Sequence, residues 1–204
     1  PLPGNTLLVS GASGGVGVAS VLLGKSMGLT VVALSRSQDK ATRLRELGAD
    51  HVFDPTDPGL VKAVTTKLGE GPIDLAIDTV GGPLFPKIIA LLGYGGRISI
   101  VGRSGGTVPQ FNTATLLFRR IRLGGVAVSD YGPQEAQTIW QEIVHRLTTA
   151  GRRPLVDSIV AFEDVKHGFA RLAQGPLGKV LVQVTKGEET ADGQGAPARV
   201  LSPS

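Results

Sequence analysis

Along residues 6–128, two hydrophobic patterns alternate. Short runs of aliphatic and β-branched residues are followed by segments whose apolar residues recur every three or four positions, which is typical of a parallel sheet flanked by helices. The helical spacing predicts helices at residues 15–27, 39–47, 57–68 and 84–92. The short runs predict strands at residues 6–10, 30–35, 51–54, 73–77, 97–101 and 123–128. This rhythm predicts an α/β fold, a doubly wound parallel six-stranded sheet with the strand order 3-2-1-4-5-6.

The periodicity changes after residue 132. Residues 133–149 carry apolar side chains at helical spacing and predict a long helix. A strand at 158–162, a helix at 163–173 and a last strand at 178–184 are predicted to follow. Residues 187–204 are rich in Gly, Ala, Pro, Ser and Glu and have almost no apolar anchor, which predicts a disordered tail.

The composition narrows the classes of partner. The chain of 204 residues carries 21 Lys and Arg against 17 Asp and Glu, spread along its length, with a formal net charge of +4. Short basic runs at 119–122 and 152–153 predict solvated surface, because a nucleic-acid site needs a broader basic face. No apolar run approaches the ~20 residues of a membrane span. We therefore expect a cytoplasmic protein that binds neither nucleic acid nor a membrane.

Candidate catalytic and metal-binding groups are few. The chain has no Cys, which excludes thiolate metal sites, and His51, His145 and His167 fall in separate predicted elements. We therefore expect no metal site, and we assign no catalytic residue. The first residue is Pro rather than Met, so we expect the natural chain to begin upstream.

The most informative segment starts with the first predicted strand. Residues 7–17 read LLVSGASGGVG, so an apolar run stops at a glycine cluster within which a helical pattern begins. Glycines let a backbone approach a pyrophosphate closely, and the start of a helix offers it unpaired N–H groups. We therefore expect a dinucleotide-binding Rossmann domain over residues 1–132, with a phosphate loop of Ala12, Ser13, Gly14, Gly15, Val16 and Gly17.

Two motifs describe this loop. Read as A-x-G-x-x-G, it consists of Ala12, Gly14 and Gly17 and resembles the zinc-independent branch of the medium-chain dehydrogenases/reductases, the quinone oxidoreductase and enoyl reductase group. Read as G-x-x-x-G-x-G, it consists of Gly11, Gly15 and Gly17 and resembles the short-chain dehydrogenases. Short-chain enzymes use a Tyr with a Lys four residues later as a proton-donor pair. The tyrosines at positions 94 and 131 are followed at that spacing by Ile and Glu, so the pair is absent.

Further segments resemble the medium-chain family, in the same order, over residues 3–185. They are PGN at 3–5, LGADHV at 47–52, DLAIDTVG at 74–81, GGRISIVG at 95–102 and GKVLV at 178–182. The resemblance implies an oxidoreductase of the zinc-binding dehydrogenase family that transfers hydride from a nicotinamide cofactor to a small molecule, a quinone or an activated C=C bond. It also implies a homodimer in which the strand at 123–128 pairs across a two-fold axis.

The end of the second predicted strand indicates which nicotinamide cofactor binds. An NAD site usually carries Asp or Glu there for the ribose 2′-hydroxyl. This chain instead carries Ser35, Arg36 and Ser37, followed by Lys40. A guanidinium binds a phosphate through paired, charge-assisted hydrogen bonds, which a carboxylate would oppose. We therefore predict NADPH, with Arg36 as the main ligand of the 2′-phosphate and the other three residues in support.

Further cofactor contacts are expected at the carboxyl ends of the fourth and fifth strands, where open α/β sheets bind ligands. For Asp78, a local Asx turn or helix cap is about as consistent with the sequence as a cofactor contact. By resemblance, the predicted contacts are Thr79, Val80 and Gly81 on the adenosine side and Val101, Gly102 and Arg103 on the nicotinamide side.

The resemblance also implies a barrel-like N-terminal domain that supplies most of the substrate pocket and any zinc ligands. That domain is absent from these residues, and residues 133–186 are expected to be a connecting helix and the strand–helix–strand C-terminal part of the catalytic domain. We expect this chain alone to bind NADPH but to turn over poorly, because hydride transfer needs a substrate held close to the nicotinamide. Two alternatives remain open: a zinc-dependent alcohol dehydrogenase with its metal ligands in the missing domain, and a non-catalytic NADPH-binding regulatory domain.

Overall fold

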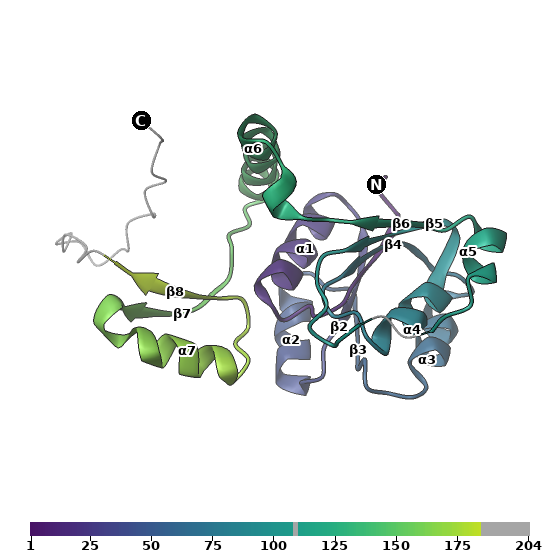
Figure 1. The fold of residues 1–204 in the computed structure, drawn as a ribbon, viewed down its shortest axis with the longest axis horizontal. Helices are drawn as coiled ribbons and strands as arrows, with labels where there is room; N and C mark the ends of the chain where they lie inside the picture. The colour runs from purple at the N-terminus through teal and green to yellow at the C-terminus, as the bar shows by residue number, and fades with distance from the viewer. Residues whose placement is uncertain (108–109, 185–204) are drawn as a thin grey trace.

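The computed structural model describes residues 1–107 and 110–184 (Figure 1). Its centre is a six-stranded sheet in which all neighbouring strands are parallel. The strand order, β3-β2-β1-β4-β5-β6, confirms the predicted doubly wound topology. The strands are β1 (Thr6–Val9), β2 (Thr30–Leu34), β3 (His51–Phe53), β4 (Ile73–Asp78), β5 (Leu92–Ile100) and β6 (Arg122–Gly125).

Helices cover both faces of this sheet (Figure 1): α1 (Gly15–Ser26), α2 (Gln38–Glu46), α3 (Leu60–Leu68), α4 (Leu84–Leu91) and α5 (Ala114–Arg119). Successive residues of a strand point to opposite faces. Leu8 of β1 belongs to the same buried cluster as Leu60 of α3 and Ile88 of α4. Its neighbour Leu7 belongs to the cluster on the other face, with Leu44 of α2. The core therefore consists of two apolar layers separated by the sheet.

Two elements of this sheet domain begin elsewhere than predicted. The helix expected from residue 57 begins at Leu60, because the carboxylate of Asp57 first accepts a hydrogen bond of 2.7 Å from the amide of Gly59 and forms a turn. The fifth strand begins at Leu92 rather than at residue 97. Leu92 pairs with Ile73 across a register shift, in a glycine-rich segment that hides the strand pattern.

The sixth strand is shorter than predicted. It covers Arg122–Gly125 rather than residues 123–128, because the chain turns into the 3-10 helix η1 (Val128–Asp130). The prediction was wrong for the second half of that segment. Helix α5, just before this strand, was not predicted, since its six residues are too few for a helical period to be recognised.

A second unit follows the sheet domain. Helix α6 (Pro133–Thr149) has the predicted bounds and packs on α1 through Leu147. Strands β7 (Val156–Ala161) and β8 (Lys179–Gln183) form a parallel pair joined by the 3-10 helix η2 (Phe162–Asp164) and α7 (Val165–Ala173). This confirms the strand–helix–strand unit, although β7 lies earlier than predicted and α7 begins only after the 3-10 turn. The tail predicted at residues 187–204 lies outside the described residues.

The segment between α7 and β8 joins the second unit to the sheet domain. The amide of Gly178 donates a hydrogen bond of 3.0 Å to the carbonyl of Ser13, in the glycine loop. The ammonium of Lys40 donates to the carbonyl of Gly175. Leu177 packs against the apolar cluster beneath α1 and α2. The C-terminal unit therefore touches the predicted phosphate loop directly.

Candidate functional site

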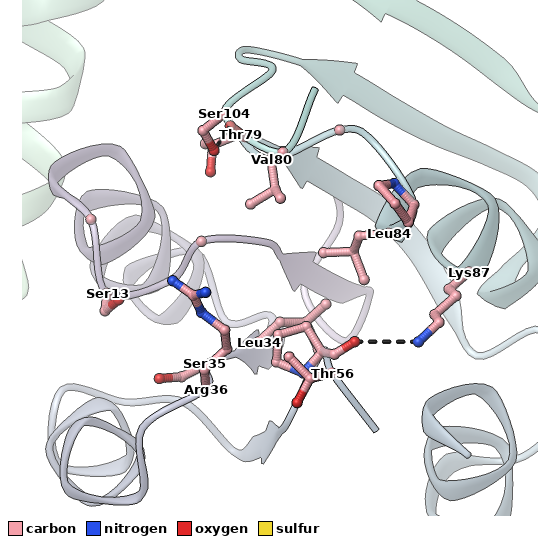
Figure 2. A pocket seen from close by; sticks show the side chains of 16 residues that line it. Ser13, Leu34, Ser35, Arg36, Thr56, Thr79, Val80, Leu84, Lys87 and Ser104 are labelled. Carbon is pink, nitrogen blue, oxygen red and sulfur yellow. Dashed lines mark hydrogen bonds between the residues drawn. The ribbon is translucent and has the colours of Figure 1, made fainter. Parts of the chain in front are cut away.

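A cavity of about 610 Å³ lies at the carboxyl ends of β1, β2 and β4 (Figure 2). Arg36 and Lys87, on opposite sides of the view in Figure 2, are its only charged lining residues in the part of the chain that the structure describes. A cavity with two cationic side chains and no carboxylate favours an anionic ligand. The lining residues are Gly11, Ser13, Gly14, Leu34, Ser35, Arg36, Pro55, Thr56, Thr79, Val80, Gly81, Pro83, Leu84, Lys87, Ser104 and Gly105.

The glycine loop places the start of α1 at this cavity. No side chain caps the helix, and its first turn has no acidic residue. Within residues 1–107 and 110–184, the amides of Gly15, Val16 and Gly17 donate to no acceptor. A Cβ atom on Gly17 would lie 2.5 Å from Cα of Ala12, so only glycine allows the helix to approach the loop this closely. The positive end of the helix therefore has unpaired N–H groups available for an anion.

Lys179 brings a further positive charge to the same place. A Cβ atom built on Gly15 would lie 2.6 Å from Nζ of Lys179, so the ammonium lies over the first residue of α1. A cation at the N-terminus of a helix is unfavourable by itself, because the helix dipole is positive there. An anion bound between the two would be attracted by both, and these attractions would outweigh the repulsion. The sequence analysis missed Lys179, although it lies in the GKVLV segment, because its proximity to the loop depends on the tertiary fold.

Asp78 shapes the loop after β4. Its side chain is fully buried, and Oδ1 accepts hydrogen bonds from the hydroxyl of Ser10 at 2.6 Å and from the amides of Val80 and Gly81 at 3.0 Å each. Asp78 does not line the cavity. Of the two interpretations left open by the sequence, the structure thus shows the local Asx-type turn, which holds the lining residues Thr79, Val80 and Gly81 in place.

The loop after β3 forms another wall of the cavity. Nζ of Lys87 donates to the carbonyls of Pro55 at 3.3 Å (dashed in Figure 2) and of Asp57 at 3.1 Å, and so ties this loop to α4. Hydrogen bonds from the hydroxyl and amide of Thr56 hold the pKa of Asp54 below its usual value, and the charges of Arg36 and Lys87 lower it further. A carboxylate therefore lies within electrostatic reach of Arg36.

The structure brings part of the predicted cofactor set together. Ser13, Gly14, Ser35, Arg36, Thr79, Val80 and Gly81 line the cavity, and Ala12, Gly15, Val16 and Gly17 belong to the loop and helix start beside it. Ser37 instead caps α2 by accepting from the amide of Lys40, whose ammonium is directed to the C-terminal unit. Val101, Gly102 and Arg103 do not line the cavity, whereas their neighbours Ser104 and Gly105 do. The sequence analysis missed these two and Lys87, since no pattern marks them.

Metal-binding clusters and membrane-spanning helices are both absent from the described residues. Among the described residues, no group of three His, Cys, Asp or Glu side chains is arranged to hold a metal ion. In the same part of the chain, no helix combines the length and the apolar composition needed to cross a membrane.

Comparison with known proteins shows the family to which the chain is related. The profile of a family described as "Zinc-binding dehydrogenase" matches residues 15–147. The chain is 30% identical over 190 residues to an acryloyl-coenzyme A reductase of Sulfurisphaera tokodaii, covering 88% of this chain and 51% of that protein. It is 28% identical over 187 residues to quinone oxidoreductase-like protein 2 of Bos taurus, covering 89% and 54%. The chain thus spans about half the length of the curated relatives it matches.

Solved structures of dehydrogenases and related proteins superpose on the chain. A structure described as an NAD-dependent alcohol dehydrogenase superposes with a TM-score of 0.77 at 30% identity, covering 90% of this chain and 52% of that one. Escherichia coli K-12 YhdH with bound NADPH superposes with a TM-score of 0.71 at 27% identity, covering 89% and 55%.

Proposed function

The chain belongs to the zinc-binding dehydrogenase family, within the zinc-independent quinone oxidoreductase and enoyl reductase branch of the medium-chain dehydrogenases/reductases, and from this premise we propose that it is the NADPH-binding part of an oxidoreductase. The reaction is hydride transfer to an electron-poor carbon of a quinone or an activated C=C bond. The relatives named for acryloyl-CoA reduction and quinone reduction support this substrate class.

One observation carries the cofactor assignment: cationic groups and free amides lie in and beside a cavity that has no carboxylate among its described lining residues. NADPH carries a pyrophosphate and a ribose 2′-phosphate, and the cavity offers a separate place for each. The amides at the start of α1, together with Lys179, would hold the pyrophosphate. Arg36 and Ser35, at the carboxyl end of β2, would hold the 2′-phosphate. The structure of YhdH with bound NADPH supports the choice of cofactor.

The remaining residues of the cavity shape it. Leu34 and Pro55 offer apolar surface for the adenine ring, and the loop fixed by Asp78 closes the opposite side. The segment 101–103 follows β5. By resemblance to the family, we expect it to lie on the nicotinamide side. When bound, NADPH supplies a hydride from C4 of the nicotinamide. The chain's own residues orient the cofactor, and we propose that the substrate is held mainly by residues outside this chain, so that the chain alone turns over poorly.

The test is an equilibrium titration of the wild-type chain and of Arg36→Ala with NADPH and NADH. We expect wild type to prefer NADPH, and Arg36→Ala to lose about tenfold or more in NADPH affinity while NADH affinity changes little, because only NADPH has the 2′-phosphate. The matched control is Arg43→Ala, which removes an exposed arginine of α2 that does not line the cavity. It should change neither affinity. Equal affinity of wild type for both cofactors would contradict the assignment to NADPH.

We also propose how the chain is organised. Residues 1–132 form the dinucleotide-binding domain, and residues 133–186 form the connecting helix and part of the catalytic domain. The protein works in the cytoplasm as a homodimer paired through the edge strand β6, which covers the first half of the predicted segment 123–128. All four residues of β6 are exposed and β6 has a single neighbour, β5, which supports the pairing. Leu123→Lys should shift the dimer towards monomer in sedimentation, whereas Leu2→Lys, at another exposed leucine, should not.

A second candidate is a zinc-dependent alcohol dehydrogenase, which is favoured by the superposition on an NAD-dependent alcohol dehydrogenase. It predicts preference for NADH in the same titration, and zinc bound by residues outside this chain. A zinc-free full-length protein that prefers NADPH would exclude it. Cofactor binding by a full-length protein without any reductase activity would instead support a regulatory domain.

A further inference from the structure

An ion pair in the C-terminal unit has paired hydrogen bonds and a nearly buried carboxylate. Nε and Nη2 of Arg171, on α7, donate to the two carboxylate oxygens of Asp157, on β7, at 2.7 and 2.6 Å. This is the paired arrangement that gives an arginine–carboxylate contact directional strength. The Asp157 side chain is only 9% exposed. It lies at an irregularity of the β7–β8 ladder, between Val156 and Ser158, where a strand can redirect a side chain.

The same carboxylate controls the turn that leads to the glycine loop. Oδ1 of Asp157 also accepts a hydrogen bond of 3.1 Å from the amide of Leu177. The next residue, Gly178, donates its amide to the carbonyl of Ser13 at 3.0 Å. The residue after that is Lys179, whose ammonium lies over Gly15 at the start of α1. A continuous series of contacts therefore connects Asp157 to the predicted pyrophosphate site.

We propose that Asp157 and Arg171 are positioning residues of the cofactor site: their ion pair fixes residues 175–178 so that Lys179 lies against the start of α1, where the cofactor's pyrophosphate binds. This inference rests on the proposed function. Neither residue touches the cofactor. Their contribution passes through Lys179, a flexible side chain whose backbone is also held by its pairing with Val156 and by the hydrogen bond of 3.0 Å from its amide to the carbonyl of Leu155.

The geometry distinguishes this role from simple stabilisation of the C-terminal unit. If the ion pair only stabilised the fold, its loss would lower the free energy of unfolding and would weaken the binding of every ligand to a similar extent. A positioning pair acts on the pyrophosphate, because Arg36 and Ser35, which follow β2, have no hydrogen bond to residues 175–178 in the described part of the chain. Of the residues predicted to bind the 2′-phosphate, Lys40 is the one that contacts this segment, through the carbonyl of Gly175 and not through Leu177 or Asp157. Affinity for a ligand that has only the 2′-phosphate should therefore be insensitive to Asp157.

The experiment is a calorimetric titration of the 204-residue chain with NADPH, NADH and adenosine 2′-monophosphate. The variants are Asp157→Asn, Lys179→Met and the double variant. The control is Glu142→Gln, which breaks the exposed Glu142–Arg146 pair on α6. Lys179→Met should weaken NADPH and NADH by about tenfold each. Asp157→Asn should weaken both by at least about threefold and leave adenosine 2′-monophosphate unchanged. On the Lys179→Met background, Asp157→Asn should have no further effect, because the two residues act in series. Arg171→Lys should retain more NADPH affinity than Arg171→Met.

Three outcomes would overturn the proposal: no effect of Asp157→Asn on NADPH affinity, independent addition of the two losses in the double variant, or an equal loss for adenosine 2′-monophosphate. If Asp157→Asn does not fold, hydrogen exchange of the wild-type chain is measured instead. NADPH should then slow exchange of the Leu177 and Gly178 amides, and unchanged exchange rates would refute the proposal. A wild-type chain that binds adenosine 2′-monophosphate but no dinucleotide would refute the positioning role alone, whereas one that binds none of the three ligands would refute the proposed function itself.

Discussion

The hydroxyl of Ser10 donates a hydrogen bond of 2.6 Å to Oδ1 of Asp78 and so joins the carboxyl end of β1 to that of β4. Both side chains are completely buried. The hydroxyl of Ser10 also accepts from the amide of Thr79 at 2.9 Å. These bonds fix the positions of β1 and β4 relative to each other. The two strands flank the switch point of the sheet, where doubly wound sheets bind their ligands. The buried pair therefore holds the cavity-lining residues Thr79, Val80 and Gly81 in place before any cofactor binds.

The first prediction concerns this buried carboxylate. Asp78→Ala should lower the free energy of unfolding by about 3 kcal/mol, because it leaves the hydroxyl of Ser10 and the amides of Val80 and Gly81 without their acceptor. Asp78→Asn keeps an oxygen at the same place and should cost clearly less. Urea denaturation of both variants measures the difference, and equal losses would show that the hydrogen bonds to Oδ1 contribute little.

The second prediction concerns the glycine loop. In Gly17→Ala the new methyl group would lie 2.5 Å from Cα of Ala12, against backbone that cannot move aside without shifting α1. We expect a loss of about 1–3 kcal/mol in unfolding free energy, together with weaker NADPH binding, because the amides at the start of the helix shift. Gly132→Ala, where a methyl group meets nothing within 4 Å, is the control. Unchanged NADPH affinity in Gly17→Ala would contradict the phosphate role of the loop.

The third prediction concerns the charge near Arg36. Asp54 is exposed, and its pKa is lowered mainly by hydrogen bonds from Thr56 and to a smaller extent by the charge of Arg36. Asp54→Asn should therefore raise affinity for NADPH a few-fold with little change for NADH, because it removes a negative charge that competes with the 2′-phosphate for the guanidinium. The gain should shrink at high salt. Titrations at two ionic strengths test this. An equal gain in affinity for NADPH and NADH would show that Asp54 does not compete with the 2′-phosphate for Arg36.

The fourth prediction is a pH dependence of stability. The hydrogen bonds from Arg171 hold the pKa of Asp157 at about 2, below the ordinary 3.8. A carboxyl whose pKa is depressed in the folded state stabilises it above the unfolded pKa, and this contribution is lost as the pH falls through the folded pKa. Wild type should therefore exceed Asp157→Asn in unfolding free energy by at most about 2 kcal/mol near neutral pH, and the gap should close between about pH 4 and pH 2. A gap that stays constant over that interval would show that the ion pair is not its source.

Most of the fold could be predicted from the sequence, because each strand and long helix carries its own periodicity. Leu7 and Leu8 alternate between the two faces of the sheet as a parallel strand requires, and the order of the strands follows from the βα rhythm. The segments that could not be predicted lack such a pattern. The short helix α5 is one, and the start of β5 among glycines is another.

The candidate cofactor site could be predicted only where it depends on local sequence. The glycine loop and Arg36 follow strands directly, so their position at the carboxyl edge follows from the topology. Lys179 was missed because it reaches Gly15 from a different unit. Lys40 was predicted to support the 2′-phosphate, but its ammonium donates to the carbonyl of Gly175, a contact that no spacing in the sequence indicates. Its role at the phosphate stays a prediction.

The central claim is that the carboxyl edge of β1, β2 and β4 holds NADPH through two separate phosphate contacts. A crystal structure of the chain with NADPH tests this most directly. The account predicts the pyrophosphate between the start of α1 and the ammonium of Lys179, and the 2′-phosphate against the guanidinium of Arg36. A cofactor bound elsewhere, or a cavity left empty by a saturating concentration of NADPH, would contradict it.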